Sequence, residues 1–211
     1  MRIVKEAEER KNEILDRADE LFCKKGFEGT STNDILKAVG IARGTLYYHF
    51  KSKGDIMDAL IERYNKHILN AAKSAAQNHE LTIYERMIKV ILSMRLSQYS
   101  TQSEELIEHI HKPQNILMHQ KIQKVIIQGI TPILSDLIKE GIQQGLFDTQ
   151  VPYECMEMMM IYATTLLDSG LIELTQEEQY LRIKALFINV ERMLGCKAGD
   201  LKECMRLLDE S

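Results

Sequence analysis

The chain has 211 residues, with 27 Lys and Arg against 31 Asp and Glu, so its formal charge is −4. Because 45% of the residues are hydrophobic and 27% are charged, the chain can bury a core, and disordered, collagen-like and disulfide-scaffold classes are excluded. The net acidity argues at first against nucleic-acid binding, since such domains usually carry a basic surplus.

The N-terminal segment and the cysteines both indicate a cytoplasmic protein. Residues 1–11 are charged with no apolar h-region behind them, and no run of ~18 apolar residues occurs, so we expect no signal peptide and no membrane span. The four cysteines, Cys23, Cys155, Cys196 and Cys204, have no metal-binding spacing. Reduced thiols in a reducing compartment are therefore expected.

Helical periodicity marks the first predicted element. It ends near Gly26, where a glycine is suited to a helix C-cap. Its apolar residues recur at i, i+3, i+4, i+7 and i+8, and they are Ile14, Leu15, Ala18, Leu21 and Phe22. Because the chain has no strand-like alternation of useful length, the sequence predicts an all-α fold.

Two capping-box spacings mark a pair of short helices and the helix that follows them. Ser31 with Asp34 opens the first short helix, and Gly40 permits a turn before the second. Ser52 with Asp55 repeats the spacing and opens the next helix. Two short helices across a glycine turn, packed on a preceding helix, make a helix-turn-helix.

The distribution of charge answers the objection from net acidity. Residues 35–54 contain no acid, and they carry the cations Lys37, Arg43, Lys51 and Lys53 beside His49 and two tyrosines. Such a stretch is typical of a helix that enters the major groove while its flanks hold phosphates. Considered by spacing alone, a structural corner with a solvated charged face explains the pattern equally well.

The same segment resembles a known family. The residues that carry the resemblance are Gly26-Phe27-Glu28-Gly29-Thr30-Ser31, Asp34-Ile35, Gly40-Ile41 and Gly44-Thr45-Leu46-Tyr47-Tyr48-His49-Phe50-Lys51-Ser52-Lys53. Over about residues 10–60, without gaps, the pattern is similar to the N-terminal DNA-binding domain of the TetR family of transcriptional regulators. The resemblance implies a homodimer that places two recognition helices on a double-stranded DNA operator. It also implies an all-helical C-terminal domain that binds a small-molecule effector and forms the dimer.

The resemblance assigns roles to individual positions. Arg43 and Thr45 are expected to contact bases, and Lys53 resembles a lysine that holds a phosphate near a helix N-terminus. Thr30 and Ser31 match a hydroxyl pair that caps the first motif helix near the DNA backbone. The predicted interface is Thr30, Ser31, Arg43, Gly44, Thr45, Tyr47, Tyr48, His49, Lys51 and Lys53, and the predicted core is Ile35, Val39, Leu46 and Phe50. Ala42 replaces a usual serine, which removes a cap worth roughly 1 kcal/mol.

Longer helices are predicted after the motif. We assign residues 1–54 to the helix-turn-helix domain and 55–211 to a helical ligand-binding and dimerisation domain, with the helix through Tyr64 running on into the second domain. Pro132, together with Gly129, predicts a kink near residues 128–132. Helices are predicted over residues 82–99, 103–111, 114–144, 152–169 and 176–194, with an amphipathic piece over 200–208.

The candidate effector pocket consists of apolar and amphipathic residues on helices that surround the cavity in similar proteins. These residues are Met94, Tyr99, Met118, His119, Met159 and Tyr162. The methionine-rich run 155–160 suits an adaptable pocket, and core or dimer interface is the favoured interpretation. His109 and His111 point about 200° apart on a helix and cannot share an ion, so no metal and no cofactor is expected.

These observations predict a cytosolic, homodimeric, ligand-responsive DNA-binding regulator, acting as a repressor of a palindromic operator and making no membrane contact. Because no nucleotide loop, G-x-S-x-G or H-E-x-x-H motif occurs, an enzyme is not expected. Two alternatives stay open. One is an activator, or a regulator switched by a protein partner or by thiol oxidation; the other is a helical binding module whose motif no longer contacts DNA.

Overall fold

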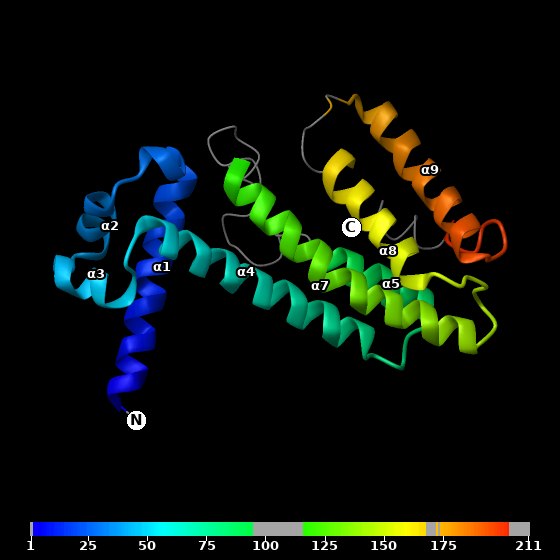
Figure 1. Cartoon of the computed structure of the whole chain (residues 1–211), viewed down its shortest axis with the longest axis horizontal. Helices are drawn as coiled ribbons and strands as arrows, with labels where there is room; N and C mark the ends of the chain where they lie inside the picture. Colours follow the sequence, from blue (N-terminus) through cyan, green and yellow to red (C-terminus); the bar gives the residue numbers. More distant parts are fainter. Residues whose placement is uncertain (1, 95–115, 168–171, 173, 203–211) are drawn as a thin grey trace. The chain divides into compact units, whose positions relative to one another are not determined.

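The computed structural model describes residues 2–94, 116–167, 172 and 174–202, and all the regular secondary structure in these ranges is helical (Figure 1). The helices are α1 (Arg2–Gly29), α2 (Thr32–Val39), α3 (Arg43–His49), α4 (Lys53–Ala76), α5 (Ile83–Leu92), α7 (Ile116–Gln143), α8 (Pro152–Tyr162), the π-helical turn η3 (Ala163–Leu167) and α9 (Gln176–Leu194). The predicted all-α fold is confirmed. None of the helices in the described ranges combines the length and apolar character that a membrane span requires.

The described residues form two compact units. One contains the residues up to Lys66 together with 116–122, and the other contains 67–94 and the residues from Gln123 onward. Helices α4 and α7 contribute to both units. As predicted, α4 runs from the first unit into the second without a break, and it ends at Ala76.

In the first unit, α1 changes direction at Gly26. The residue has φ 75° and ψ 164°, which is non-helical and favours glycine, so the prediction that the first helical run ends near Gly26 is confirmed. Of its predicted apolar stripe, Ile14, Leu15, Ala18 and Phe22 are buried, and Leu21 is half-buried. The following segments of the same unit contribute the buried residues Ile35, Leu46, Phe50, Ile56, Leu60 and Tyr64.

Polar contacts tie α1 to α4. The Tyr64 hydroxyl donates a hydrogen bond to the Asp19 carboxylate, and Arg63 Nη1 lies 2.6 Å from Asp16 Oδ1. Burial raises the pKa of Asp19, against the opposing effects of Tyr64 and Arg63. These contacts fix the helix that follows the motif against the helix that precedes it.

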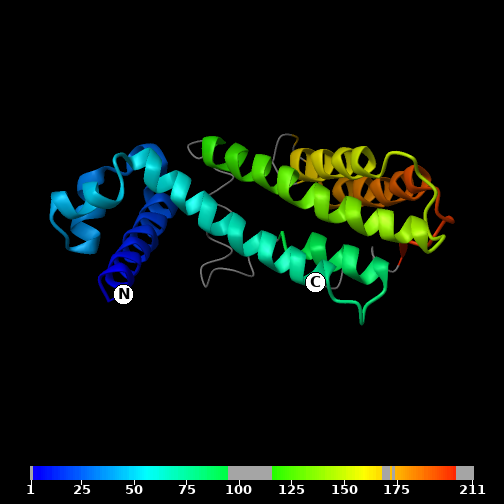
Figure 2. The ribbon, with the colours of Figure 1, turned by 60° about the horizontal axis from the view of Figure 1, so that its bottom comes forward.

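In the second unit, α8 and α9 run side by side (Figures 1 and 2), and α4 and α7 come close together where Leu69 meets Gly129. Gly129 explains how close α4 comes to α7, because a Cβ at this position would lie 2.4 Å from Leu69 Cδ2. Helix α7 is continuous through Pro132, which is exposed. The bend expected near residues 128–132 stays a prediction. Gly129 thus serves a close helix–helix approach.

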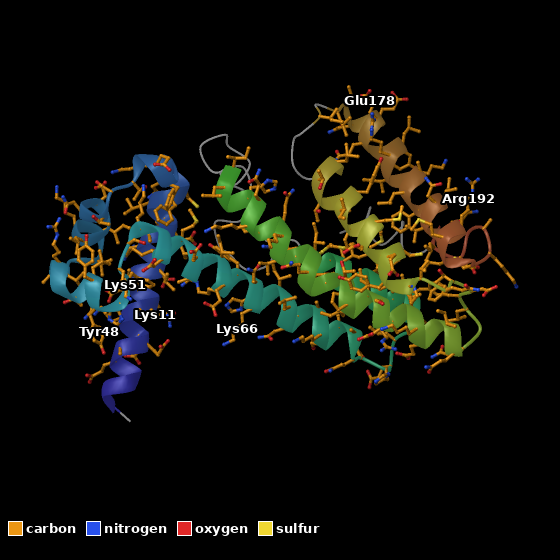
Figure 3. All side chains as sticks on the ribbon, viewed as in Figure 1. Lys11, Tyr48, Lys51, Lys66, Glu178 and Arg192 are labelled. Carbon is orange, nitrogen blue, oxygen red and sulfur yellow. The ribbon has the colours of Figure 1, made fainter. Side chains whose placement is uncertain are left out.

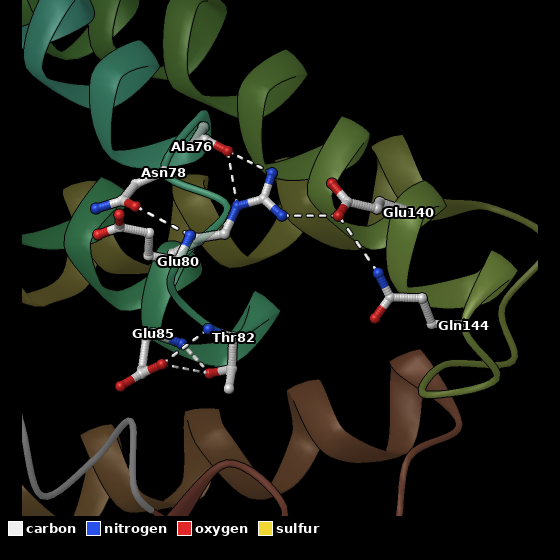
Figure 4. A network of polar contacts seen from close by, with 8 residues as sticks. Ala76, Asn78, Glu80, Thr82, Glu85, Glu140 and Gln144 are labelled. Carbon is white, nitrogen blue, oxygen red and sulfur yellow. Dashed lines mark hydrogen bonds and ion pairs between the residues drawn. The ribbon is translucent and has the colours of Figure 1, made fainter.

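At the C-terminal end of α4, a buried arginine of α5 makes polar contacts with α4 and α7 (Figure 4). Arg86 is 4% exposed, and its Nε donates to the Ala76 carbonyl at 2.7 Å. Its Nη1 donates to Glu140 Oε1 at 2.7 Å, and Gln144 Nε2 lies 3.4 Å from the same oxygen. The hydrogen bond from Arg86 lowers the pKa of Glu140. A terminal carbonyl of α4 therefore has a charged donor.

The later helices agree with most of the predicted limits. α5 begins at a Thr82–Glu85 capping box and ends at Leu92, not at the predicted residue 99. At this end the Ser93 hydroxyl donates to the Val90 carbonyl and the Met94 N–H donates to the Ile91 carbonyl, so these bonds replace the regular helical ones. α7 and α8 begin within two residues of prediction, and α9 matches its predicted limits. The predicted helix 103–111 and most of the piece 200–208 lie outside the described residues.

Candidate nucleic-acid interface

The first motif helix, α2, starts at a complete capping box. Asp34 N–H donates to Ser31 Oγ at 3.1 Å, and Ser31 N–H donates to Asp34 Oδ2 at 2.9 Å. The hydrogen bonds from Ser31 lower the pKa of Asp34, with help from Lys25 Nζ at 3.2 Å. Since the box needs only residues three apart, the sequence predicted it correctly.

The turn and the second motif helix, α3, follow from local chemistry as well. Gly40 ends α2 with φ 74° and ψ 34°, and its N–H donates to the Leu36 carbonyl. Ala42 caps α3 without a side-chain hydrogen bond, as its replacement of serine predicts. Leu46 is buried on one side of α3, so the opposite side faces outward.

The helix that follows α3 has its own cap. Asp55 N–H donates to Ser52 Oγ at 3.1 Å, and Asp55 Oδ2 accepts from the backbone N–H of Lys51 at 2.9 Å. These bonds lower the pKa of Asp55, the Ser52 side chain having the largest effect. The return bond reaches Lys51, so the box is offset by one residue from the usual pattern.

Most predicted DNA-contacting side chains are accessible. Tyr48 is 79% exposed and Tyr47 is 44% exposed, and Tyr48 and Lys51 project from the ribbon at α3 and just beyond it (Figure 3). The exposed members of the predicted set are Ser31, Arg43, Gly44, Tyr47, Tyr48 and Lys51, and the half-buried members are Thr45, His49 and Lys53. The rings of Tyr48 and His49 meet edge-on with centroids 5.0 Å apart.

Thr30 does not share this surface. It is 1% exposed, and its hydroxyl donates to the carbonyls of Gly26, at 2.8 Å, and Leu21, at 3.2 Å. The hydroxyl therefore satisfies carbonyls that the break at Gly26 leaves without helical donors. The family resemblance placed Thr30 with Ser31 as a hydroxyl pair near the DNA backbone, and only the fold separates an inward from an outward side chain.

Three cations remain accessible within the acid-free stretch. Lys37, Arg43 and Lys51 are exposed and form no ion pair with any residue that the structure describes. Lys53 differs, since its Nζ lies 2.6 Å from the Phe27 carbonyl and 4.0 Å from Glu28 Oε2. Uncompensated cations that flank exposed aromatic side chains suit a polyanion.

The predicted effector residues that the structure describes belong to both units. Met159 is buried and Tyr162 half-buried, and both line a groove of about 370 Å³ between α8 and α9. Met94 is half-buried just beyond α5 in the same unit, whereas the buried His119 belongs to the other unit. Residue Tyr99 and the side chain of Met118 lie outside the described residues.

An exposed apolar face on α8 and α9 completes the candidate sites. Met158 is 62% exposed and Leu181 is 54% exposed, with Ile161 and Ile188 also exposed. In the methionine-rich run, Cys155, Met156, Met159 and Met160 are buried, as the core interpretation predicts, and Met159 also lines the groove between α8 and α9. Sequence reasoning missed Ile161, Leu181 and Ile188, because apolar residues on two sides of a helix do not tell which side packs inward.

The cysteines show no arrangement for redox chemistry among the described residues. Cys23, Cys155 and Cys196 form no disulfide with one another, while Cys204 lies outside those residues. Burial raises the pKa of the Cys196 thiol to about 11, with Glu191 adding to the effect, so its reactive thiolate is disfavoured. Within the described ranges no three His, Cys, Asp or Glu residues gather as metal ligands, and His109 and His111 fall outside them.

Two family models match this chain. One, for bacterial regulatory proteins of the tetR family, covers residues 14–60, and one for the tetracyclin repressor-like C-terminal domain covers residues 99–188. The first includes all of α2 and α3 with their caps.

Similar proteins include the HTH-type transcriptional regulator TtgR of Pseudomonas putida, 24% identical over 158 residues that span 71% of this chain and 75% of the relative. The negative transcriptional regulator IcaR of the biofilm operon icaADBC in Staphylococcus epidermidis is 28% identical, over 54% of this chain and 68% of the relative. A crystal structure of a gamma-butyrolactone receptor (ArpA-like protein) superimposes with a TM-score of 0.60 over 98% of this chain and 100% of that chain. At 16% sequence identity, that likeness shows the fold alone.

Proposed function

The chain belongs to the TetR family of bacterial transcriptional regulators, and we propose that it acts as a homodimeric repressor that a small molecule releases from a palindromic operator. The observation that carries the DNA-binding part is the outward side of α3, which combines an exposed arginine with two exposed tyrosines. We place the protein in the cytoplasm and assign it no catalytic activity, as the family's role in transcription implies.

The recognition surface follows from helical spacing. Arg43 and Tyr47 are four residues apart, as are Gly44 and Tyr48, so each pair shares a side of α3. The buried Leu46 lies opposite the Gly44 and Tyr48 side of α3. We assign α3 to the major groove and its flanking Lys51 to a phosphate, as in other helix-turn-helix proteins.

The dimer is proposed to form through α8 and α9. Met158 and Ile161 lie three residues apart on α8, and Leu181 and Ile188 lie seven apart on α9, so each pair shares a face. All four are exposed in the single chain. Burying them against the same face of a second copy removes this apolar surface from water and makes a four-helix bundle. Residues 1–54 then bind DNA and 55–211 bind the effector and the partner.

The effector acts by favouring a conformation in which the two recognition helices do not fit adjacent major grooves. The name of one relative, the negative transcriptional regulator IcaR, supports the repressor part of this proposal. Reciprocity follows, because an effector that weakens DNA binding must itself bind the DNA complex less tightly by the same factor.

The test is a selection of sequences from a random duplex library by the full-length protein, followed by gel-shift titration at several salt concentrations. A true operator is an inverted repeat whose affinity falls steeply as salt rises. Failure to enrich any sequence, or a salt-independent shift, would show that the motif no longer contacts DNA. An effector found by screening should bind more weakly when the operator is present, and equal affinities would exclude the release mechanism.

A further inference from the structure

We propose that Lys53 is a positioning residue, which holds the segment after the recognition helix against α1 and makes no phosphate contact of its own. This inference rests on the proposed DNA binding. It differs from the sequence-based expectation, which placed Lys53 among the phosphate ligands because it opens the helix after the recognition helix.

The Lys53 ammonium is engaged inside the first unit. Its Nζ donates to the Phe27 carbonyl at 2.6 Å and lies 4.2 Å from the centroid of the Phe27 ring. The side chain is 21% exposed. A carbonyl acceptor and an aromatic face together satisfy much of the ammonium, in the geometry of a cation–π contact.

The Phe27 carbonyl needs such a donor because α1 changes direction at the preceding residue. Gly26 leaves the helical region, so carbonyls near it lose their regular helical donors. Thr30 supplies its hydroxyl to the Leu21 and Gly26 carbonyls. At Phe27, the Thr30 N–H is a long 3.3 Å away and Lys53 supplies the short bond.

This bond ties two ends of the motif together. Phe27 precedes the cap of α2, and Lys53 is the first residue of α4, four residues after α3 ends at His49. The bond therefore links the segment before the motif to the segment after it, and it limits how α3 tilts on α1. A shift of about 1 Å in such a support is enough to misplace the side chains that read bases.

The local charge also argues against a phosphate contact. Glu28 Oε2 lies 4.0 Å from Lys53 Nζ and its side chain is 81% exposed, so a phosphate that approached Lys53 would approach this carboxylate as well. Lys51, two residues earlier, is exposed and has no such neighbour among the described ion pairs. Lys51 and Lys53 thus form a natural matched pair of cations with different surroundings.

The experiment compares the full-length variants Lys53→Met and Lys51→Met by fluorescence anisotropy over a range of NaCl concentrations. The probe is a labelled duplex carrying the sequence that the wild-type protein selects from a random library. Each lost phosphate contact reduces the slope of log K against log[salt] by about 0.9, or about 1.8 for both subunits of a dimer. Circular dichroism at the assay temperature establishes that each variant is folded.

We expect Lys51→Met to reduce the slope by this amount, and Lys53→Met to weaken binding several-fold at every salt concentration with the slope unchanged. Lys53→Arg, which keeps a donor for the Phe27 carbonyl, should restore much of the affinity. A slope for Lys53→Met that falls as far as that of Lys51→Met would overturn the inference.

A second variant covers the case in which Lys53→Met does not fold. Phe27→Leu changes no charge but removes the ring beneath the ammonium, and it should lower the affinity with an unchanged slope. Wild-type affinity in Phe27→Leu would overturn the positioning role. If the wild-type protein itself selects and binds no duplex, the proposed DNA binding is wrong, and so is this inference that rests on it.

Discussion

The outward sides of α3 and of the α8–α9 pair are opposite in character. On α3 the accessible residues are a cation and two tyrosines, whereas on α8 and α9 they are aliphatic side chains and a methionine. Cations without partners suit a polyanion, and a cluster of exposed apolar side chains suits an apolar protein surface. One chain therefore presents two surfaces of different chemistry, to which the proposed contacts with DNA and with a second copy are assigned.

Two kinds of polar contact hold the helices in both regions. Around α2 and α3, capping boxes join residues three apart, such as Ser31 with Asp34. Around α5 and α7, the polar links join residues far apart in sequence, such as Arg86 with Glu140 and Gln123 Nε2 with the Thr164 carbonyl at 2.6 Å. The comparison teaches that caps fix where helices begin in both units, as at Thr82 with Glu85, whereas links between distant residues, such as Tyr64 with Asp19, fix how the helices of each unit pack.

The largest expected effect concerns the exposed apolar face of α8 and α9. Met158→Glu places a charge in the α8–α9 face, so the dimer should dissociate and operator affinity should fall by about a hundredfold or more, because two linked half-sites become independent. Sedimentation velocity and anisotropy measure both effects. Gln128→Glu, the same charge change on the exposed side of α7, is the control. A dimeric Met158→Glu protein with wild-type affinity would contradict this assignment of the interface.

The next effect concerns the long-range polar links. Arg86→Met removes the donor to the Ala76 carbonyl and to Glu140, which should lower the free energy of unfolding by about 3 kcal/mol. Urea denaturation measures the change. Lys139→Ala, which breaks an exposed pair with Asp136, should cost about 0.5 kcal/mol or less. Equal losses in the two variants would show that burial of Arg86 contributes nothing.

On the DNA-binding side, Arg43→Ala and Tyr48→Ala should each weaken operator binding by about 1–3 kcal/mol, as for a lost base contact. Both side chains are exposed, so the unfolding transition should stay within about 0.5 kcal/mol of wild type. Gel-shift titration checks the affinity, with the exposed Lys66→Ala on α4 as control. Unchanged binding in both variants would remove α3 as the recognition helix.

The smallest effect tests the local caps through pH. Hydrogen bonds from Ser31 lower the pKa of Asp34 from 3.8, so the folded state holds this proton less tightly than the unfolded state. The resulting stabilisation is complete above about pH 3.8 and is lost as the pH falls through the folded-state pKa. Asp34→Asn should therefore be less stable than wild type at neutral pH, and the difference in urea midpoint should close in acid. A difference independent of pH would rule out the carboxylate as its cause.

The predictability of each feature from sequence depends on the range of the contacts behind it. The caps at Ser31 and Ser52, the turn at Gly40 and the uncapped start at Ala42 could all be predicted, because each involves residues within four positions. The inward orientation of Thr30 could not, since it depends on where the break at Gly26 puts free carbonyls.

In the C-terminal unit, the helices could be predicted by period but their facing surfaces could not. Gly129 was interpreted as a weak point beside Pro132, whereas it makes room for Leu69 of α4. The pocket candidates Met94 and His119 were chosen by residue type, and they belong to different units. Residue type does not encode which helix lies opposite.

The sequence by itself determined an all-α chain, a helix-turn-helix with its caps, and an acid-free basic stretch that removes the objection raised by the net charge of −4. Helix periods, caps and turns are short-range effects, and a linear pattern carries them fully. Only the tertiary structure decided that Lys53 faces Phe27 while Lys51 faces outward, and that Met158 lies on an open face beside buried Met159. These outcomes require contacts between distant segments, and such contacts depend on how helices pack, which no local pattern specifies.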